Sequence, residues 1–131
     1  MEYVRVSEEY SALAEKVIED HEDLHWIRKL NVRIGYLASN WEKKKSGRFV
    51  LGECIRVKDL YRPFVPHDFL IVIYRRNTIA LTEKQMEILM YHELLHIGID
   101  EAGEELKYVV NPHDLEEFRA VADRYGVDWA E

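Results

Sequence analysis

LTEKQMEILMYHELLHI, residues 81–97, is predicted to form one helix, around which the rest of the chain is arranged. Its apolar residues recur every three or four positions, as on a helix face that packs against a core; they are Met86, Leu89, Met90, Leu94 and Ile97. Thr82 is suited to cap the amino end, and Glu83 to lie in the first turn, where the helix dipole favours negative charge. Gly98 is expected at the C′ position, where it would end the helix.

Residues 92–96 of this helix read His-Glu-Leu-Leu-His, which has the form H-E-x-x-H. Histidines four residues apart lie on one face of a helix and can bind one Zn²⁺ through ring nitrogens, at about 2.0–2.1 Å each. The glutamate after the first histidine can take a proton from water as that water attacks a carbonyl polarised by the metal. This spacing is typical of zinc-dependent peptidases. We therefore predict His92 and His96 as metal ligands and Glu93 as the catalytic base.

A second H-E-x-x-H occurs at His21-Glu22-Asp23-Leu24-His25. It lies at the end of an acidic helix, without the apolar surroundings that would orient the ligands of a metal site and exclude water from it. No third ligand follows it at a suitable distance before the predicted strands begin. We favour residues 92–96 as the metal site. If residues 21–25 were the site instead, replacing His92 would leave the zinc content unchanged.

A catalytic zinc takes three protein ligands and keeps one position open. The histidine that remains after His96 is His113, at the start of the last predicted helix, and we predict it as the third ligand. Glu116 and Glu117 are the alternatives, because a carboxylate from a second helix is another known third ligand. Tyr108 is a candidate hydrogen-bond donor to the oxyanion, although a tyrosine of the core or rim fits the pattern equally well.

The bulk composition is that of an ordinary globular protein, and we expect a single domain over residues 1–131. Hydrophobic residues make up 47% of the chain and charged residues 33%. One cysteine, Cys54, excludes an intrachain disulfide or a cysteine zinc ribbon, so a zinc site must use histidines and carboxylates. The amino end has no apolar signal region, and no apolar run is long enough to cross a membrane. We therefore expect a cytoplasmic protein with no membrane partner.

Charge is unevenly distributed along the chain, whose formal net charge is −7. Residues 28–76 contain 12 of the 18 Lys and Arg but four of the 25 Asp and Glu, a net charge of +8. Such asymmetry can mark a surface that binds nucleic acid or an acidic partner. A solvated hairpin with scattered strand-face cations explains it as well, and we favour this explanation because no nucleic-acid-binding motif accompanies the charge.

The remaining periodicities predict an α+β fold. A long helix is expected over Ser7–Lys29, bent near His21–Asp23, and a last helix from Asn111 to Gly126. Strands are expected at Val32–Tyr36, Arg48–Lys58 and Asp68–Arg75, with a short strand or extended rim at Leu106–Val110. The third strand is apolar on both faces, which indicates a central position in the sheet. We thus predict a domain with an N-terminal helix, a small, mainly antiparallel sheet of about three strands, the H-E-x-x-H helix and a C-terminal helix.

The chain resembles a known family in three segments, which are the His92–His96 motif, residues 113–118 (HDLEEF) and residues 125–129 (YGVDW). It looks like the small metallopeptidase domain of phages, bacteria and archaea, and is more distantly similar to minimal gluzincins and SprT-like proteases. The resemblance implies a zincin-like fold, with zinc on His92, His96 and His113 and Glu93 as base. Unlike SprT-like proteins, the chain has no cysteine zinc ribbon, so the resemblance does not extend to activity on DNA-bound proteins.

The favoured hypothesis is a metallopeptidase with one Zn²⁺ per chain, acting on a peptide or protein. The first alternative is a zinc-binding protein without hydrolytic activity. Such a protein would keep zinc and show no difference in hydrolysis between the parent and Glu93→Gln. The second is an interaction module whose basic segment 28–76 binds nucleic acid, with an affinity that falls steeply with salt. The substrate and the oligomeric state do not follow from the sequence.

Overall fold

The computed structural model describes residues 1–100, 107–112, 121 and 124–125. No helix in these parts of the chain has both the length and the apolar character needed to span a membrane. In chain order the elements are β1 (Val4–Val6), α1 (Glu8–Asp20), η1 (Glu22–Leu24), α2 (Trp26–Lys29), β2 (Ile34–Ser39), β3 (Lys44–Lys45), β4 (Arg48–Phe49), β5 (Gly52–Arg56), η2 (Asp59–Tyr61), β6 (Phe69–Tyr74), α3 (Arg75–Thr78), α4 (Glu83–Leu95), β7 (Ile97–Asp100) and β8 (Lys107–Val110).

The main sheet has four strands in the order β1-β2-β6-β5, and the predicted α+β class is confirmed. The two outer pairings, β1 with β2 and β5 with β6, are antiparallel, whereas β2 and β6 run parallel. The sheet is therefore mixed and one strand larger than predicted. β6 is interior, as its apolar character on both faces indicated. Two small antiparallel pairs, β3-β4 and β7-β8, lie outside this sheet.

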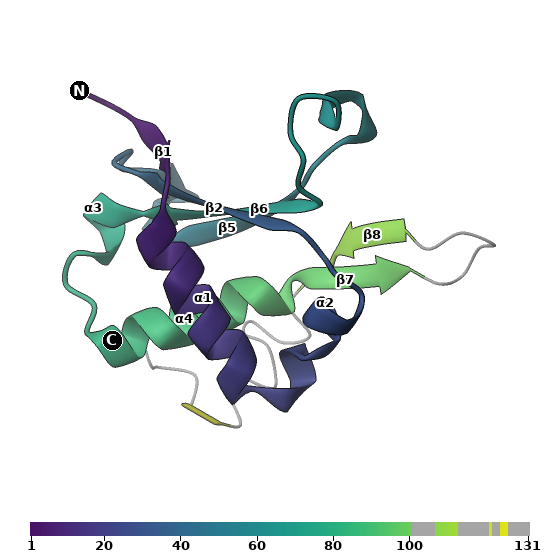
Figure 1. Cartoon of the computed structure of the whole chain (residues 1–131). Helices are drawn as coiled ribbons and strands as arrows, with labels where there is room; N and C mark the ends of the chain where they lie inside the picture. The colour runs from purple at the N-terminus through teal and green to yellow at the C-terminus, as the bar shows by residue number, and fades with distance from the viewer. Residues whose placement is uncertain (101–106, 113–120, 122–123, 126–131) are drawn as a thin grey trace.

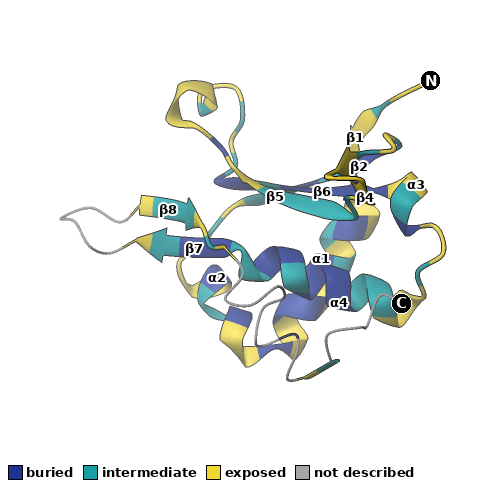
Figure 2. Ribbon diagram, turned by 180° about the vertical axis from the view of Figure 1, so that it is seen from behind, coloured by how far each residue is buried: buried dark blue, intermediate teal, exposed yellow. Residues whose placement is uncertain are grey.

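Helices α1 and α4 pack side by side under one face of the sheet (Figure 1). Alternate residues of β2 and β6 point to this face, because successive side chains of a strand point to opposite sides. The core is formed by these strand residues with the buried faces of the two helices, which appear dark blue in Figure 2. Its largest fully buried members are Tyr91, Phe69, Ile18, Leu24, Ile71, Ile73, Met90 and Leu94. This burial fixes α4, and with it the motif, against the sheet.

The predicted N-terminal helix is broken where a bend was expected. α1 ends at Asp20, and His21 takes an extended conformation with φ −127° and ψ 108°. The chain then forms η1 and the short helix α2. The His21 ring donates a hydrogen bond through Nδ1 to the carbonyl oxygen of Val17, at 2.7 Å, and stacks on Tyr91 with centroids 4.0 Å apart. These contacts hold the bend against α4.

The prediction of one continuous strand over Arg48–Lys58 is wrong. Residues 48–49 form β4, which pairs with β3 through a tight turn at Ser46 and Gly47, both with positive φ. The chain then passes to the main sheet at Val50, whose carbonyl oxygen accepts a hydrogen bond from the Asn77 side chain at 2.7 Å. β2 likewise begins and ends two to three residues later than predicted, at Ile34 and Ser39. β1 was not predicted at all.

The motif helix matches its prediction closely at the amino end. The Thr82 side chain accepts a hydrogen bond from the Gln85 backbone N–H at 3.2 Å, and the Gln85 side chain accepts one from the Thr82 N–H at 2.9 Å. This is a reciprocal capping box, which satisfies two backbone donors that a helix start leaves without partners. The first residue of the motif lies ten residues into the same helix, so the cap also fixes where the motif begins.

The predicted role of Gly98 is wrong. The cap at the carboxyl end of α4 is His96, and the chain continues directly into β7, where Gly98 is paired opposite Val109 of β8. A Cβ atom at position 98 would overlap the side chain of Asn111. Glycine is present here because another segment approaches the backbone closely, and a helix end is not the reason.

Removing the cap should weaken the fold measurably. Thr82→Ala deletes the side-chain acceptor of the capping box, so we expect the free energy of unfolding to fall by about 1 kcal/mol. Urea denaturation followed by circular dichroism would measure this. Thr82→Ser keeps the acceptor and serves as the control; equal losses in both variants would contradict the capping role.

The close approach at Gly98 predicts a second stability effect. Gly98→Ala should destabilise the fold by about 1–3 kcal/mol, because the new methyl group displaces the Asn111 side chain. Asn111→Ala removes that side chain, so the double variant should lose less stability than the sum of the single losses. Additive losses in urea denaturation would show that the overlap is not the cause.

Candidate metal centre

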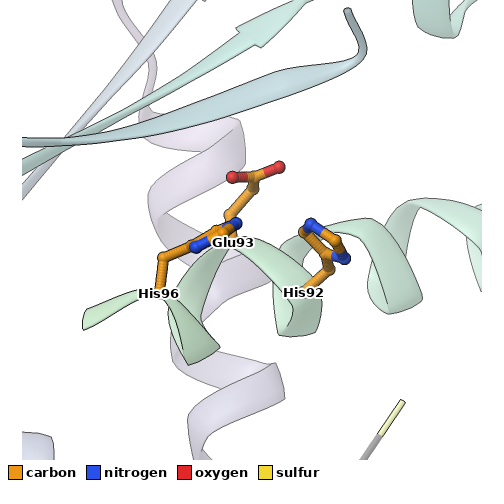
Figure 3. Close-up of side chains that lie close together, drawn as sticks. All are labelled: His92, Glu93 and His96. Carbon is orange, nitrogen blue, oxygen red and sulfur yellow. The ribbon is translucent and has the colours of Figure 1, made fainter. Parts of the chain in front are cut away.

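Three side chains with metal-binding or acid–base chemistry meet on the last turn of α4 and its cap. One nitrogen of His92, one nitrogen of His96 and one carboxylate oxygen of Glu93 all lie within 4.8 Å of one another. The two imidazole rings have centroids 5.1 Å apart and planes at 71°. Figure 3 shows the Glu93 carboxylate pointing from the helix toward the strands above it. Within the described part of the chain, this is the group of His, Cys, Asp and Glu residues close enough to hold a metal ion.

The His96 ring is oriented by the backbone of Asn111, the residue that follows β8. Nδ1 of His96 lies 2.6 Å from the carbonyl oxygen of Asn111, and the Asn111 N–H donates to the carbonyl oxygen of His96, also at 2.6 Å. A carbonyl oxygen can only accept, so Nδ1 must carry the proton and the neutral ring keeps its lone pair on Nε2. Such a contact to the far nitrogen typically fixes the tautomer and orientation of a metal-ligating histidine.

Glu93 is almost fully buried, with 3% of its surface exposed, beneath β5. A Cβ atom at position 52 would lie 3.2 Å from Oε2 of Glu93, closer than ordinary van der Waals contact. The glycine at the start of β5 therefore gives the carboxylate the space it occupies. Gly52 was missed in the sequence, although a glycine inside a predicted strand is itself a sign of close backbone approach.

Cys54 is the next residue of β5 on the face that covers Glu93, and it lies near the same carboxylate. Burial raises the pKa of its thiol far above the ordinary value, and the nearby charge of Glu93 raises it further. The thiol is therefore protonated at neutral pH.

The cluster opens into a cleft of about 510 Å³ between α4, β5 and the end of β8. Its wall includes two charged residues from different strands, Lys45 of β3 and Glu53 of β5. The Glu53 carboxylate is held by Lys43 and by the hydroxyl of Tyr74, which donates to it at 3.0 Å. Burial, and then this hydrogen bond, raise the pKa of Tyr74. The cleft therefore combines a polar wall with the buried carboxylate of Glu93.

The second H-E-x-x-H does not form a comparable group. Residues 22–24 are a 3₁₀ helix, so His21 and His25 do not share one α-helical face. Beyond its bond to Val17, the His21 ring contacts the Tyr125 hydroxyl through Nε2, at 3.2 Å. Nε2 of His25 lies 3.0 Å from the carbonyl oxygen of Glu19. Both rings are engaged in holding the bend.

The other predicted site residues are placed as follows. Tyr108 packs edge-on against Phe69, with ring centroids 5.5 Å apart, and lines a neighbouring recess, whereas Val110 is the β8 residue that reaches the cleft. His113, Glu116 and Glu117 lie outside the described residues, as does most of the predicted C-terminal helix. Of that helix, Val121, Arg124 and Tyr125 are described and are helical, and Val121 is fully buried.

The α+β fold and the His-Glu-His cluster on its central helix define a protein equipped to hold a metal ion beside a buried carboxylate. A family model described as putative phage metallopeptidase matches residues 1–131. The chain belongs to this family, whose description implies a metal ion and a peptidase. Searches of curated proteins and of solved structures give no significant match.

The cluster predicts which histidines control metal content. His92→Ala and His96→Ala should each reduce bound metal well below one ion per chain, because each removes one ligand from a small set. His25→Ala, which alters the second H-E-x-x-H, is the matched control and should retain the metal. Metal analysis of purified, dialysed protein would test this. Metal that persists in both motif variants and is lost in the control would place the site at residues 21–25.

Proposed function

We propose that this chain is a zinc-dependent peptidase in which His92 and His96 hold the metal and Glu93 is the general base. The observation that carries the proposal is the convergence of these side chains beneath an edge strand, in a cleft large enough for a peptide segment. The nitrogen-rich donor set suits Zn²⁺, which binds imidazole readily and forms catalytic sites with three protein ligands.

The chemistry divides between the metal and the chain. Bound Zn²⁺ would supply Lewis-acid polarisation of the scissile carbonyl and would make water more acidic. Glu93 takes a proton from the attacking water as its oxygen bonds to the carbonyl carbon, and delivers that proton to the nitrogen that leaves as the C–N bond breaks. Burial beneath Gly52 keeps the carboxylate in one position and out of bulk water. Asn111 holds the His96 ring in the ligating tautomer.

The third ligand in this proposal is His113, with Glu116 and Glu117 as alternatives. Support comes from Asn111, whose backbone is joined to His96 by two hydrogen bonds. His113 is two residues after Asn111 in the sequence. Tyr108 stays a secondary candidate for stabilising the oxyanion.

The substrate in this proposal is a peptide or an extended segment of a protein. β5 is the terminal strand of the main sheet in the described part of the chain, and its first residue lies over Glu93. An extended peptide can add to such an edge through main-chain hydrogen bonds. It would then pass directly over the motif helix, which places a scissile bond beside the metal.

Glu93→Gln separates catalysis from metal binding. The amide keeps the size of the side chain but is a far weaker proton acceptor, so peptide hydrolysis should fall about 10²–10⁴-fold while metal content stays unchanged. Glu87→Gln, on the same helix at its contact with α1, is the matched control and should retain activity. Cleavage of a quenched fluorescent peptide library would measure the rates. Equal hydrolysis by parent and Glu93→Gln would favour the non-catalytic zinc-binding alternative.

The third ligand is decided by a set of three variants. His113→Ala should lose stoichiometric zinc, as His92→Ala does, whereas Glu116→Gln and Glu117→Gln should retain it. Zinc retained in His113→Ala and lost in one of the glutamate variants would move the third position to that carboxylate. Metal analysis and the peptide assay on the same samples would report the two effects separately.

A further inference from the structure

A second recess adjoins the metal cleft. Its lining is net positive, whereas the chain as a whole is net negative. It has a volume of about 730 Å³ and is bounded by the far end of β5, the loop with η2, and β8. This loop stands above β8 at one end of the sheet (Figure 1). Three cationic residues, Arg56, Arg62 and Lys107, line the recess with one acid, Asp59. The chain has a net charge of −7, so this local excess of positive charge stands out.

Arg62 is held rigidly at the edge of this recess. Its Nη1 donates to Oδ1 of Asp68 at 2.7 Å, and the Asp68 side chain is 4% exposed. Arg33 approaches the same carboxylate at 3.6 Å, so two arginines share one acid and one positive charge is in excess. Among the described residues, Nε of Arg62 is the buried side-chain polar atom without a hydrogen-bond partner. The Arg62 guanidinium is thus pre-positioned at the recess by Asp68, whereas its Nε is covered by the protein.

The recess is aligned with the metal cleft along β5. Gly52, Cys54 and Arg56 are paired with Ile73, Ile71 and Phe69 and share one face of the sheet, the face that covers Glu93. Arg56 is four residues along the strand from Gly52, a rise of about 13 Å. Val110 lines both the cleft and the recess, so the two are neighbours. A peptide extended along β5 from the metal would reach the recess three or four residues from its scissile bond.

We propose that this recess binds a carboxylate of the peptide substrate and gives the peptidase a preference for an acidic group three or four residues from the scissile bond. The inference rests on the proposed function, because the distance is measured from the metal cleft. Arginine presents a planar fork of donors that matches a carboxylate, and charge-assisted hydrogen bonds of this kind are about twice as strong as neutral ones. The carboxylate is either an Asp or Glu side chain or the carboxyl terminus of a short peptide.

Peptide binding to the full chain carrying Glu93→Gln tests the recess without depending on turnover. The probes are two fluorescently labelled peptides that differ by Glu or Gln at the third and fourth positions on both sides of a central bond. Each is prepared with a free and with an amidated carboxyl end. We expect the acidic peptide to bind about tenfold more tightly in fluorescence anisotropy. A preference for Glu over Gln that survives amidation identifies a side chain. Tighter binding of both peptides with the free end than with the amidated end identifies the terminal carboxylate.

Variants of the exposed cations show whether the recess is responsible. Arg56→Gln and Lys107→Gln should each reduce the acidic preference severalfold, and neither residue contacts the buried Asp68 in the described structure. Arg76→Gln, an exposed arginine in α3 at the opposite end of β6, is the matched control and should preserve the preference. Equal binding of all four peptides, or a carboxylate preference unchanged by both recess variants, would overturn the inference.

Two further results are informative. If the parent cleaves no peptide in a Glu93-dependent manner while acid-selective binding still depends on Arg56 and Lys107, the peptidase proposal fails and the carboxylate recess stands. A labelled single-stranded oligonucleotide is included as a competitor. If it binds more tightly than the acidic peptide and loses affinity in the same variants, the recess serves nucleic acid and the carboxylate assignment is wrong.

Discussion

Two hydrogen bonds between His96 and Asn111 join the end of the motif helix to the segment that follows β8. Each residue both donates to and accepts from the other, so the ring of His96 and the path of the chain at Asn111 are fixed together. The β7-β8 pair stands between them in sequence, and it positions Asn111 at the helix end. The metal centre we propose depends on this closure, because it orients the His96 ring.

The other half of the centre depends on the burial of α4. α4 is pinned between α1 and the sheet by its apolar face, and its capping box sets its first residue. Glu93 consequently faces β5 instead of solvent. The carboxylate and the edge strand then form one unit, which is why the basic recess along the same strand bears on substrate choice. In the proposed enzyme, the strand that aligns the peptide also covers the base and leads to the cationic residues.

The parts that could be predicted from sequence are those with local causes. The capped, periodic helix, its H-E-x-x-H motif, the bend at His21 and the interior position of β6 all follow from residues close together in the chain. Gly98, Gly52 and the Asn111 contact could not be assigned, because each depends on a segment brought near by the tertiary fold. β1 was missed because three residues carry too little periodicity, and the Arg48–Lys58 strand was overextended because its apolar pattern does not reveal a change of pairing partner.

The glycine at position 52 is also informative when other sequences are compared with this one. The space above Glu93 is closed on three sides, since a Cβ there would meet the Ile73 side chain, the Val72 carbonyl oxygen and the carboxylate itself at 3.1–3.2 Å. A homologous chain with a larger residue at this point of the strand would have to shift its glutamate or its sheet. That single position therefore offers a simple criterion, readable without coordinates, for whether the architecture of this cleft is retained.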